Sequence, residues 1–331
     1  MSTPLLSIIM LSYNAELYLK EAISSILLQD FNDYEFIIID DCSTDNSLEI
    51  IKSFKDLRIK IHQNKTNQGI VYNRNRGIKL SSGKYIGMLD SDDIALPGKF
   101  RKQIEFLEKN PDFGMIGSWA LLIDNNGKLL KNNWKLSARP EKIPSIMFFK
   151  NYFVQSAVVF RREVLPDYLY KTGYEIVEDY KLWMDIIKKS KAWNLPEYLV
   201  KYRIHGNNMT ISGENIVKEN LVAVYNELFK ELGIEPTEEE LKIHHIIREG
   251  LLIRDFNTFK NAKNWLIKLL YYNSIKKIYD RKAFAEMLLN RWTKLIWLSR
   301  KMIPFITIYY FNYSIIEEYL LSRIQQKYVR F

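Results

Sequence analysis

Cysteine is almost absent from this 331-residue chain, which contains one, Cys42. A single cysteine excludes an internal disulfide and fits a reducing compartment. Long apolar runs are also missing, because no uninterrupted stretch reaches the roughly 20 residues that a membrane-spanning helix needs. The apolar run Leu5–Leu11 is too short for a signal peptide with its usual flanks, so it predicts a first strand.

The bulk composition is that of a globular protein large enough for two domains, or for one domain with a helical extension. Hydrophobic residues make up 47% of the chain, and the formal net charge is +9. A positive excess suits anionic partners such as nucleotides, nucleic acid or an anionic membrane face. No nucleic-acid recognition motif is present, so we expect no nucleic-acid partner.

The first half of the chain alternates between strand and helix patterns. Strands are expected at residues 7–11, 35–40, 58–62 and 85–89. Helices are expected at residues 16–28, 46–54, 70–80 and up to 109, with Asn14 as the first N-cap and Pro97 in the first turn of the last helix. This rhythm predicts an α/β fold with a Rossmann-like, mainly parallel central sheet flanked by helices.

The second half begins mixed and ends helical. Strands are expected at 117–123, 154–160 and 199–203, and a helix at 178–189. Beyond Gly213 the pattern is almost entirely helical, broken mainly by Pro236 and Pro304. We therefore expect a first domain over residues 1–212 and a helical C-terminal region over residues 213–331.

The most informative stretch is a short apolar run, 85–89, that ends in Asp90-Ser91-Asp92-Asp93. Carboxylates at the C-terminal edge of an α/β sheet lie where such folds bind ligands. A divalent cation would relieve their mutual repulsion, and hard cations prefer oxygen ligands. Such a metal would also hold a diphosphate. Taken alone, the stretch could equally be a solvated acidic turn that caps the next helix.

Two other strand ends carry polar residues. The first strand runs into Ser12-Tyr13-Asn14, and the second into Asp40-Asp41-Cys42-Ser43-Thr44-Asp45. A tyrosine ring offers a face to a base, and a carboxylate can accept a hydrogen bond from a pyrimidine N–H. Helix capping is the alternative for the second segment, and we expect Thr44 or Asp45 to cap.

A third polar segment, Asn67-Gln68-Gly69, precedes a helix that carries Arg74 and Asn75. Gly69 permits close backbone approach, and Arg74 can reach phosphate or sugar oxygens. A surface helix with two arginines is the alternative for this segment.

Together, the segments SIIMLSYN, IIIDDCSTDNS, NQGIVYNRNRGI and GKYIGMLDSDD resemble the family 2 glycosyltransferases of the GT-A fold. The resemblance is dense over residues 5–110, sparser to about 210, and does not cover the C-terminal third. It implies a metal-dependent, inverting hexosyl- or N-acetylhexosaminyltransferase that uses a nucleotide-sugar donor, most often UDP-linked, with Mn²⁺ or Mg²⁺. By family analogy, the acceptor is a glycan or lipid-linked hydroxyl in cell-surface polysaccharide synthesis on the cytoplasmic side.

The resemblance also assigns roles to individual residues. It implies that Tyr13 stacks on the base, Asp41 binds the base N–H, Asp40 supports that loop, and Asp92, with Asp90, binds the metal. The predicted donor-binding set is Ser12, Tyr13, Asn14, Asp40, Asp41, Asn67, Gly69, Arg74, Asn75, Asp90 and Ser91. Cys42 departs from the family, in which glycine is common at this position, and a positive φ would strain it.

The segment Gly173–Trp183 resembles the second acidic motif of the family, in which an ED pair opens a helix. The match makes Asp179 the candidate base and Glu178 its partner or an acceptor contact. Adjacent carboxylates repel and raise one pKa, which helps a base. Acidic residues also simply favour the first turn of a helix. His205, in a segment that resembles the YRxH stretch of the family, is a candidate third metal ligand or diphosphate contact, or has neither role.

The helical C-terminal region mixes cations and aromatics near its end. Examples are Arg291, Lys294, Trp292 and Trp297, with further tyrosines beyond Pro304. One interpretation is a peripheral patch on an anionic membrane surface, which would suit a lipid-linked acceptor. The other is a helical bundle packed on the catalytic domain or on another subunit of an oligomer.

Two other functions compete with this interpretation. A sugar-1-phosphate nucleotidyltransferase shares the nucleotide-binding half, but it normally opens with a Gly-rich basic loop that the Ser12–Glu16 segment lacks. A non-catalytic, membrane-attached nucleotide-sugar binding protein would have no need of the Glu178-Asp179 pair. The sequence does not name the sugar, the acceptor or the linkage.

Overall fold

The computed structural model describes residues 3–206, 208 and 214–299. The chain divides into two compact units, one of residues 1–140 with 151–220, and one of residues 141–150 with those from 221 onward. The first unit is α/β and the second is helical. The helical unit thus includes the short segment 141–150, which the sequence analysis placed in the first domain.

The first half of the α/β unit is the regular, parallel part of its sheet. Its elements are β1 (Leu6–Ser12), α1 (Glu16–Leu27), β2 (Tyr34–Asp40), α2 (Ser47–Ser53), β3 (Ile59–Gln63), α3 (Ile70–Leu80) and β4 (Tyr85–Met88). The strands lie in the order β3-β2-β1-β4, all parallel. Ser12 pairs with Asp40 at the carboxyl ends of β1 and β2, so the polar segments after these strands begin side by side.

The second half makes the sheet mixed. Its elements are β5 (Ile94–Ala95), α4 (Lys99–Lys109), β6 (Phe113–Ile123), β7 (Val159–Arg161), α6 (Glu178–Lys189) and β8 (Lys191–Arg203). β7 is antiparallel to both β4 and β6, β6 is parallel to β8, and β5 is antiparallel to β8. The eight strands therefore form one sheet in the order β3-β2-β1-β4-β7-β6-β8-β5, which confirms the α/β fold class.

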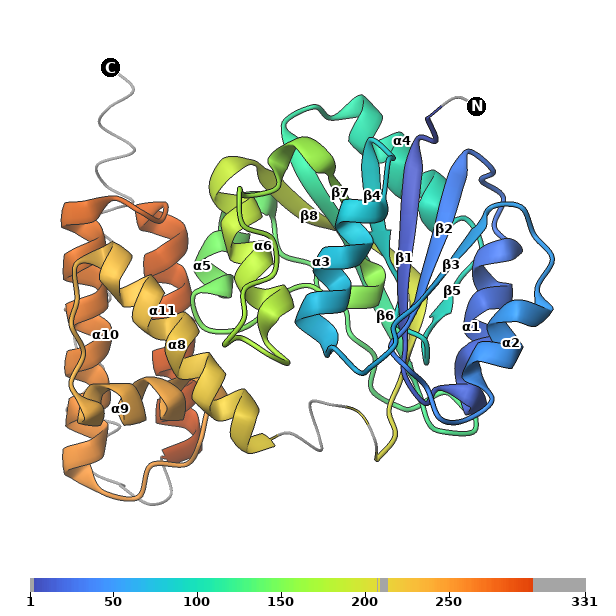
Figure 1. The fold of residues 1–331 in the computed structure, drawn as a ribbon. Coiled ribbons are helices and arrows are strands. Elements are labelled where there is room, and N and C mark those ends of the chain that lie inside the picture. The colour runs from blue at the N-terminus through green and yellow to red at the C-terminus, as the bar shows by residue number, and fades with distance from the viewer. Residues whose placement is uncertain (1–2, 207, 209–213, 300–331) are drawn as a thin grey trace. The chain divides into compact units, whose positions relative to one another are not determined.

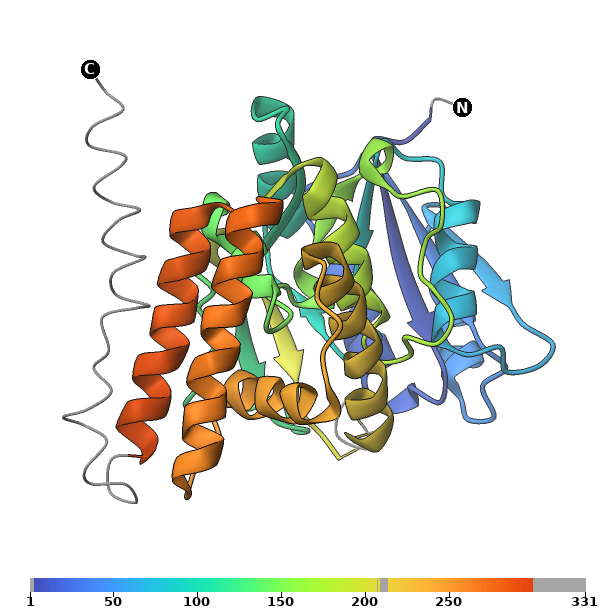
Figure 2. The ribbon, with the colours of Figure 1, turned by 90° about the vertical axis from the view of Figure 1, so that its left-hand side faces the viewer.

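Helices cover both faces of this sheet, which explains why its central strands are almost wholly apolar. Ile8 and Met10 on β1 belong to the core cluster that also contains residues of α1 and α4. Ile9 points to the other face, where Gly77 of α3 packs so closely that a Cβ there would lie 2.6 Å from Ile9 Cγ2. The ribbon views place α3 and α4 on opposite sides of the sheet (Figures 1 and 2).

Several predicted details of this unit were wrong. Asn14 is not the N-cap of α1, because Ala15 takes that place and Asn14 adopts a φ of 49°. Pro97 precedes α4 instead of lying in its first turn, since Gly98 with φ 78° is the N-cap. The expected strand at 154–160 is a 3₁₀ turn, Gln155–Ala157, followed by the short β7. β8 begins eight residues before the expected strand, at Lys191.

The helical unit contains α5 (Ile143–Met147), most of α8 (Glu214–Leu232), α9 (Glu238–Glu249), α10 (Phe256–Lys276) and α11 (Arg281–Ser299). The helical pattern predicted after Gly213 is therefore confirmed over residues 214–299. None of the helices in the described part of the chain is long and apolar enough to cross a membrane. Pro304 lies outside the described residues.

The core of this unit is built around a buried histidine. His244 of α9 stacks on Phe149 with ring centroids 4.6 Å apart, and it accepts a hydrogen bond from Trp265 Nε1 at 3.2 Å. Burial lowers the pKa of His244 well below its usual value, so the ring is a neutral core group. Phe148 packs against Phe229 in the same cluster. Segment 141–150 thus supplies core side chains to the helical unit.

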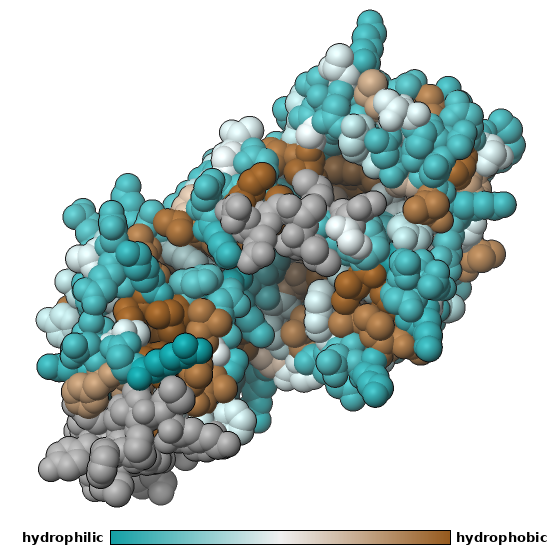
Figure 3. Space-filling view, turned by 90° about the horizontal axis from the view of Figure 1, so that it is seen from below, coloured by the Kyte–Doolittle hydropathy of each residue, from teal (hydrophilic) through white to brown (hydrophobic). Residues whose placement is uncertain are grey.

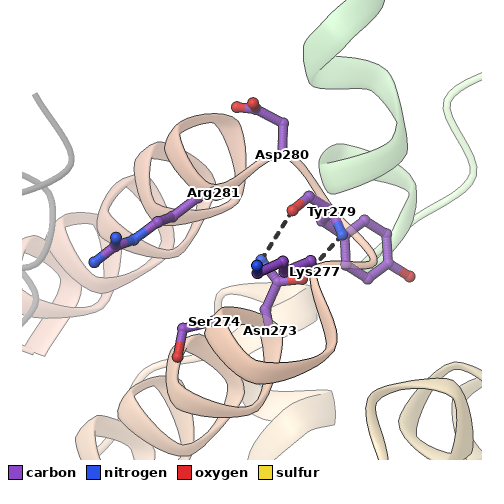
Figure 4. Close-up of a pocket in the computed structure, with 6 residues that line it drawn as sticks. All are labelled: Asn273, Ser274, Lys277, Tyr279, Asp280 and Arg281. Atoms are coloured by element: carbon purple, nitrogen blue, oxygen red, sulfur yellow. Dashed lines mark hydrogen bonds between the residues drawn. The ribbon is translucent and has the colours of Figure 1, made fainter. Parts of the chain in front are cut away.

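The surface of the helical unit carries apolar side chains and a cavity, one of whose lining residues, Tyr279, packs on Phe148 of the core. Apolar side chains also reach its surface beside charged ones (Figure 3). A cavity of about 360 Å³ lies at the turn between α10 and α11, where the Asn273 amide exchanges two hydrogen bonds with the backbone of Tyr279 (Figure 4). None of the predicted site residues lines this cavity.

Candidate active site

The loops after β1 and β2 are joined by a network of polar contacts. Asn14 Oδ1 accepts from the Thr44 N–H at 2.8 Å, and Ser43 Oγ accepts from the Asn14 N–H at 3.1 Å. Asp45 accepts from the first N–H groups of both α1 and α2, at 3.1 and 2.9 Å, but the N-cap of α2 is Asn46 and not Thr44 or Asp45 as expected. Tyr13 lies in the first of these loops, and 51% of its surface is exposed. Its ring is available to a stacking ligand.

Asp40 and Asp41 have different surroundings. The Asp41 carboxylate accepts from Asn64 Nδ2 at 2.6 Å and from the N–H groups of Gln68 and Gly69 at 2.8 and 2.9 Å. Asp40 accepts from the Ser43 N–H at 3.2 Å, and its Oδ1, like the Ser12 hydroxyl, is buried without a partner among the residues that the structure describes. Asp41 therefore shapes the loop before α3, whereas Asp40 keeps an unused acceptor.

The segment before α3 has a backbone conformation that depends on Gly69. Gly69 is the N-cap of α3 with φ 80°, and Asn67 Oδ1 accepts from its N–H at 3.2 Å. No atom of the described residues lies within 4 Å of where a Cβ of Gly69 would be, so the glycine is required by its φ and not by crowding. Cys42 has φ 64°, the strained conformation expected if it replaced a glycine.

Arg74 of α3 connects the two acidic motifs. Its Nη2 lies 3.7 Å from Asp90 Oδ1, and its Nη1 donates to Glu178 Oε1. The guanidinium also lies over the Tyr170 ring, 5.5 Å from its centroid. Arg74 is buried, and its Nε has no partner within the described part of the chain. A buried cation shared by two carboxylates brings the acidic turn after β4 and the start of α6 into one site.

Asn75, the next residue of α3, contacts the backbone of Tyr170. Its amide accepts from the Tyr170 N–H and donates to the Tyr170 carbonyl, both at 2.8 Å. This two-point contact fixes the segment before α6 to α3. Asn75 therefore has a local structural task as well as the donor-binding role implied by the resemblance.

The acidic turn after β4 separates its three carboxylates. Asp92 Oδ2 lies 2.9 Å from His205 Nε2, while Asp93 is buried and accepts from the Arg203 N–H at 2.8 Å. Burial raises the pKa of Asp90 to about 6, with further repulsion from Asp92 and Glu178 and an opposing effect of Arg74. Ser91 lies half-buried in the turn between them. Negative charge on Asp90 is therefore unfavourable in this turn.

A divalent cation fits this turn only in part. Among residues 3–206, 208 and 214–299, no three His, Cys, Asp or Glu side chains are grouped so that they could hold a metal ion. Asp92 and His205 are nevertheless in contact, and Asp90 precedes Asp92 by two residues. Carboxylate oxygens suit Mg²⁺ and Mn²⁺. The chain offers an incomplete ligand set that diphosphate oxygens and water would have to finish.

The acidic pair at the start of α6 is asymmetric. Glu178 is buried, whereas Asp179 is half-buried and accepts from Asn151 Nδ2 at 3.0 Å and from the Tyr180 N–H at 2.6 Å. Burial and the adjacent Glu178 raise the pKa of Asp179 to about 7, although Arg74 acts in the opposite direction. A carboxylate that titrates near neutrality, and that solvent can reach, is suited to accept a proton.

Comparison with known proteins identifies the chain. Residues 7–169 match the family described as Glycosyl transferase family 2. An uncharacterized glycosyltransferase of Haemophilus influenzae is 32% identical over 76% of this chain and 84% of its own length. The chain belongs to glycosyl transferase family 2. The family that its motifs resemble is thus confirmed.

Two further proteins are similar to this glycosyltransferase. The Escherichia coli UDP-Glc:alpha-D-GlcNAc-diphosphoundecaprenol beta-1,3-glucosyltransferase WfgD is 34% identical over 62% of this chain and 79% of its own length. The mannosyltransferase PcManGT from Pyrobaculum calidifontis, solved with GDP-Man and Mn²⁺, superposes with a TM-score of 0.52 at 14% identity, over 99% of this chain and 89% of that one. The structural likeness confirms the GT-A fold.

The sequence analysis of the glycosyltransferase missed two residues of the site. Arg203 is buried and donates to the Asp92 carbonyl at 2.9 Å and to Glu21 Oε2 at 2.7 Å, which fixes the acidic turn. Its place in the YRxH stretch beside His205 could have revealed it. Asn151, which donates to Asp179, stands in no motif, and no sequence signal indicated it.

Proposed function

We propose that this glycosyltransferase moves a hexosyl or N-acetylhexosaminyl group from a UDP-linked donor, with inversion, to a hydroxyl of a glycan or lipid-linked acceptor. The observation that carries the proposal is the half-buried Asp179, with its pKa near 7, in a site that Arg74 connects to the acidic turn. The UDP donor and the lipid-linked acceptor are supported by the name of the similar glucosyltransferase WfgD, and the role in cell-surface polysaccharide synthesis rests on family analogy.

In this mechanism the chain positions the reactants and moves one proton. Tyr13 stacks on the base, and Asp40 or Asp41 accepts from the base N–H. Asp179 takes the acceptor proton as the new glycosidic bond forms, and burial together with Glu178, which Arg74 holds, keeps the pKa of that base high. Asp92, Asp90 and His205 would hold a Mn²⁺ or Mg²⁺ ion, which when bound neutralises charge on the leaving diphosphate.

A donor panel tests this function. Purified protein is incubated with Mn²⁺, a set of UDP- and GDP-sugars and a lipid-linked acceptor, and the product anomer is determined by NMR. We expect turnover with at least one UDP-sugar, and a product anomer opposite to that of the donor. Turnover with retention would refute the single displacement, and turnover with GDP-sugars alone would refute the UDP assignment.

We also propose that the protein acts in the cytoplasm, peripherally on an anionic membrane surface. In support, Leu252 and Phe256, in and after the α9–α10 loop, are exposed, and so is 61% of Trp297 on α11. Ser299, two residues after Trp297, accepts from the N–H of Ile253, which joins this loop to the end of α11. Cations near apolar side chains suit anionic lipid.

Vesicle flotation tests the membrane proposal without unfolding the helical unit. Deletion of residues 282–331 would remove α11, whose Trp292 and Leu295 are buried, so point variants are better. W297D should weaken binding to vesicles rich in anionic lipid, and I275D, at an exposed apolar residue on α10, serves as the matched control. If wild-type protein ignores such vesicles, the helices serve packing or an oligomer instead.

A further inference from the structure

Asn151 has a side-chain orientation that its own neighbours determine. Its Oδ1 accepts from the Phe153 N–H at 3.1 Å, so the other end of the amide, Nδ2, must face the opposite way. Nδ2 donates to Asp179 Oδ2 at 3.0 Å. Because a backbone N–H fixes the amide, the group that meets Asp179 is a donor and not an acceptor.

The Asp179 carboxylate is held from two sides. Oδ2 meets Asn151, and Oδ1 accepts from the Tyr180 N–H at 2.6 Å. Arg74 donates instead to Glu178. The hydrogen bonds that steady Asp179 therefore come from neutral groups, one on the backbone and one on a side chain 28 residues earlier.

We propose that Asn151 is a positioning residue for the catalytic base: its amide orients the Asp179 carboxylate and stabilises the anion. This inference rests on the proposed role of Asp179. A neutral donor suits the task, since it favours the charged form modestly, whereas a lysine or arginine in its place would make the carboxylate a weaker base. The amide also leaves the second lone pair of Oδ2 for the acceptor hydroxyl.

The pH dependence of kcat/KM for transfer tests this role. In N151A the anion loses one donor, so the acid limb should move about one pH unit upward, with activity recovering at high pH. In N151D, which is nearly isosteric, a further carboxylate faces Asp179, and the limb should move at least as far. N110A, which removes an asparagine that donates to the Phe106 carbonyl, should leave the limb in place.

Two results would overturn the inference. One is an N151A enzyme with reduced activity at every pH and an unmoved limb, which indicates a merely structural role. The other is an N151D enzyme whose acid limb stays at the wild-type pH. This second test can be made even if N151A folds poorly. Donor affinity should stay at the wild-type value in both variants. The variant D179N separates this inference from the proposed function, because activity in D179N would refute the base itself, whatever the Asn151 variants do.

Discussion

At the scale of single residues, the acidic turn makes the most specific prediction. Asp92 contacts His205 and is the most direct candidate metal ligand. In D92A, we expect Mn²⁺ to lose its effect on UDP affinity, with a fall of at least about tenfold when metal is present. Titration calorimetry with and without Mn²⁺ measures this, and D112A, at an exposed aspartate outside the predicted site, is the control. Wild-type, metal-dependent affinity in D92A would remove Asp92 from the ligand set.

Cys42 offers a test of backbone strain at the same scale. Its φ of 64° costs a residue with a Cβ about 1 kcal/mol or more relative to glycine. C42G should therefore be more stable than C42A by about 1 kcal/mol, since both lack the thiol and only glycine relieves the strain. Urea denaturation measures the difference. Equal stability of the two variants would mean that the turn relaxes without glycine.

Motif residues could be predicted from the sequence because each lies a few positions from its neighbours in the motif. Asp90, Asp92 and the Glu178-Asp179 pair were predicted in this way. The contacts between motifs could not be predicted, since they join distant positions. Arg74 meets Glu178 across 104 residues, and Asn75 meets Tyr170 across 95. Only the folded chain reveals that one arginine serves both acidic motifs.

At the scale of elements, Glu35 of β2 ties the parallel strands together. Its carboxylate accepts from Ser7 of β1 at 2.6 Å, from Lys60 of β3 at 2.5 Å and from the Ser82 N–H, just before β4, at 2.6 Å. Burial alone would raise its pKa, but these hydrogen bonds outweigh burial and lower the pKa of Glu35 to about 2. The ionised carboxylate therefore stabilises the edge of the sheet where the strands begin.

The effect of E35Q on stability should depend on pH. A lowered folded-state pKa contributes stability that is present above the unfolded value, near 4.5, and is lost as the pH falls toward 2. E35Q should therefore be clearly less stable than wild type at pH 7, by a margin that narrows below pH 4. Urea unfolding across this pH range measures the difference in stability between E35Q and wild type. The control is E49Q, at the exposed Glu49. A margin independent of pH would contradict this account.

Elements with strong periodicity were predicted with their observed ends. α3 and α6 begin and end where the sequence placed them. The ends of β7 and β8 were not predicted correctly, because pairing with other strands determines where they begin and end. β7 is a three-residue strand between β4 and β6, and β8 starts where it joins β6. A strand as short as β7 has little pattern of its own.

At the scale of the whole molecule, segment 141–150 belongs with helices that follow it by more than seventy residues. Nothing in its composition marks it as different from its neighbours, so the sequence analysis divided the chain once, near residue 212. A chain ended at residue 212 keeps Phe148 and Phe149 but loses the helices that bury them. Exposed aromatics of this size favour aggregation.

The truncated protein 1–212 should therefore bind a hydrophobic dye and aggregate. Replacing residues 141–150 with a Gly-Ser linker in the same truncation should restore solubility, because the orphaned apolar segment is gone. Light scattering and dye fluorescence measure both proteins. A monomeric 1–212 that binds no dye would show that segment 141–150 does not depend on the helical unit.

The central claim is that Asp179 is the base, with a pKa near 7, in a site that also binds the donor. Below that pKa the carboxylate is protonated and inactive, so the transfer rate of wild-type enzyme should rise with pH through about 7. The most direct measurement is this pH profile for wild type and D179N, with UDP affinity determined for each protein. We predict a limb near pH 7 in wild type, and in D179N a loss of transfer of at least about a hundredfold with unchanged UDP affinity. Wild-type transfer by D179N, or equal loss of transfer and binding, would contradict the account.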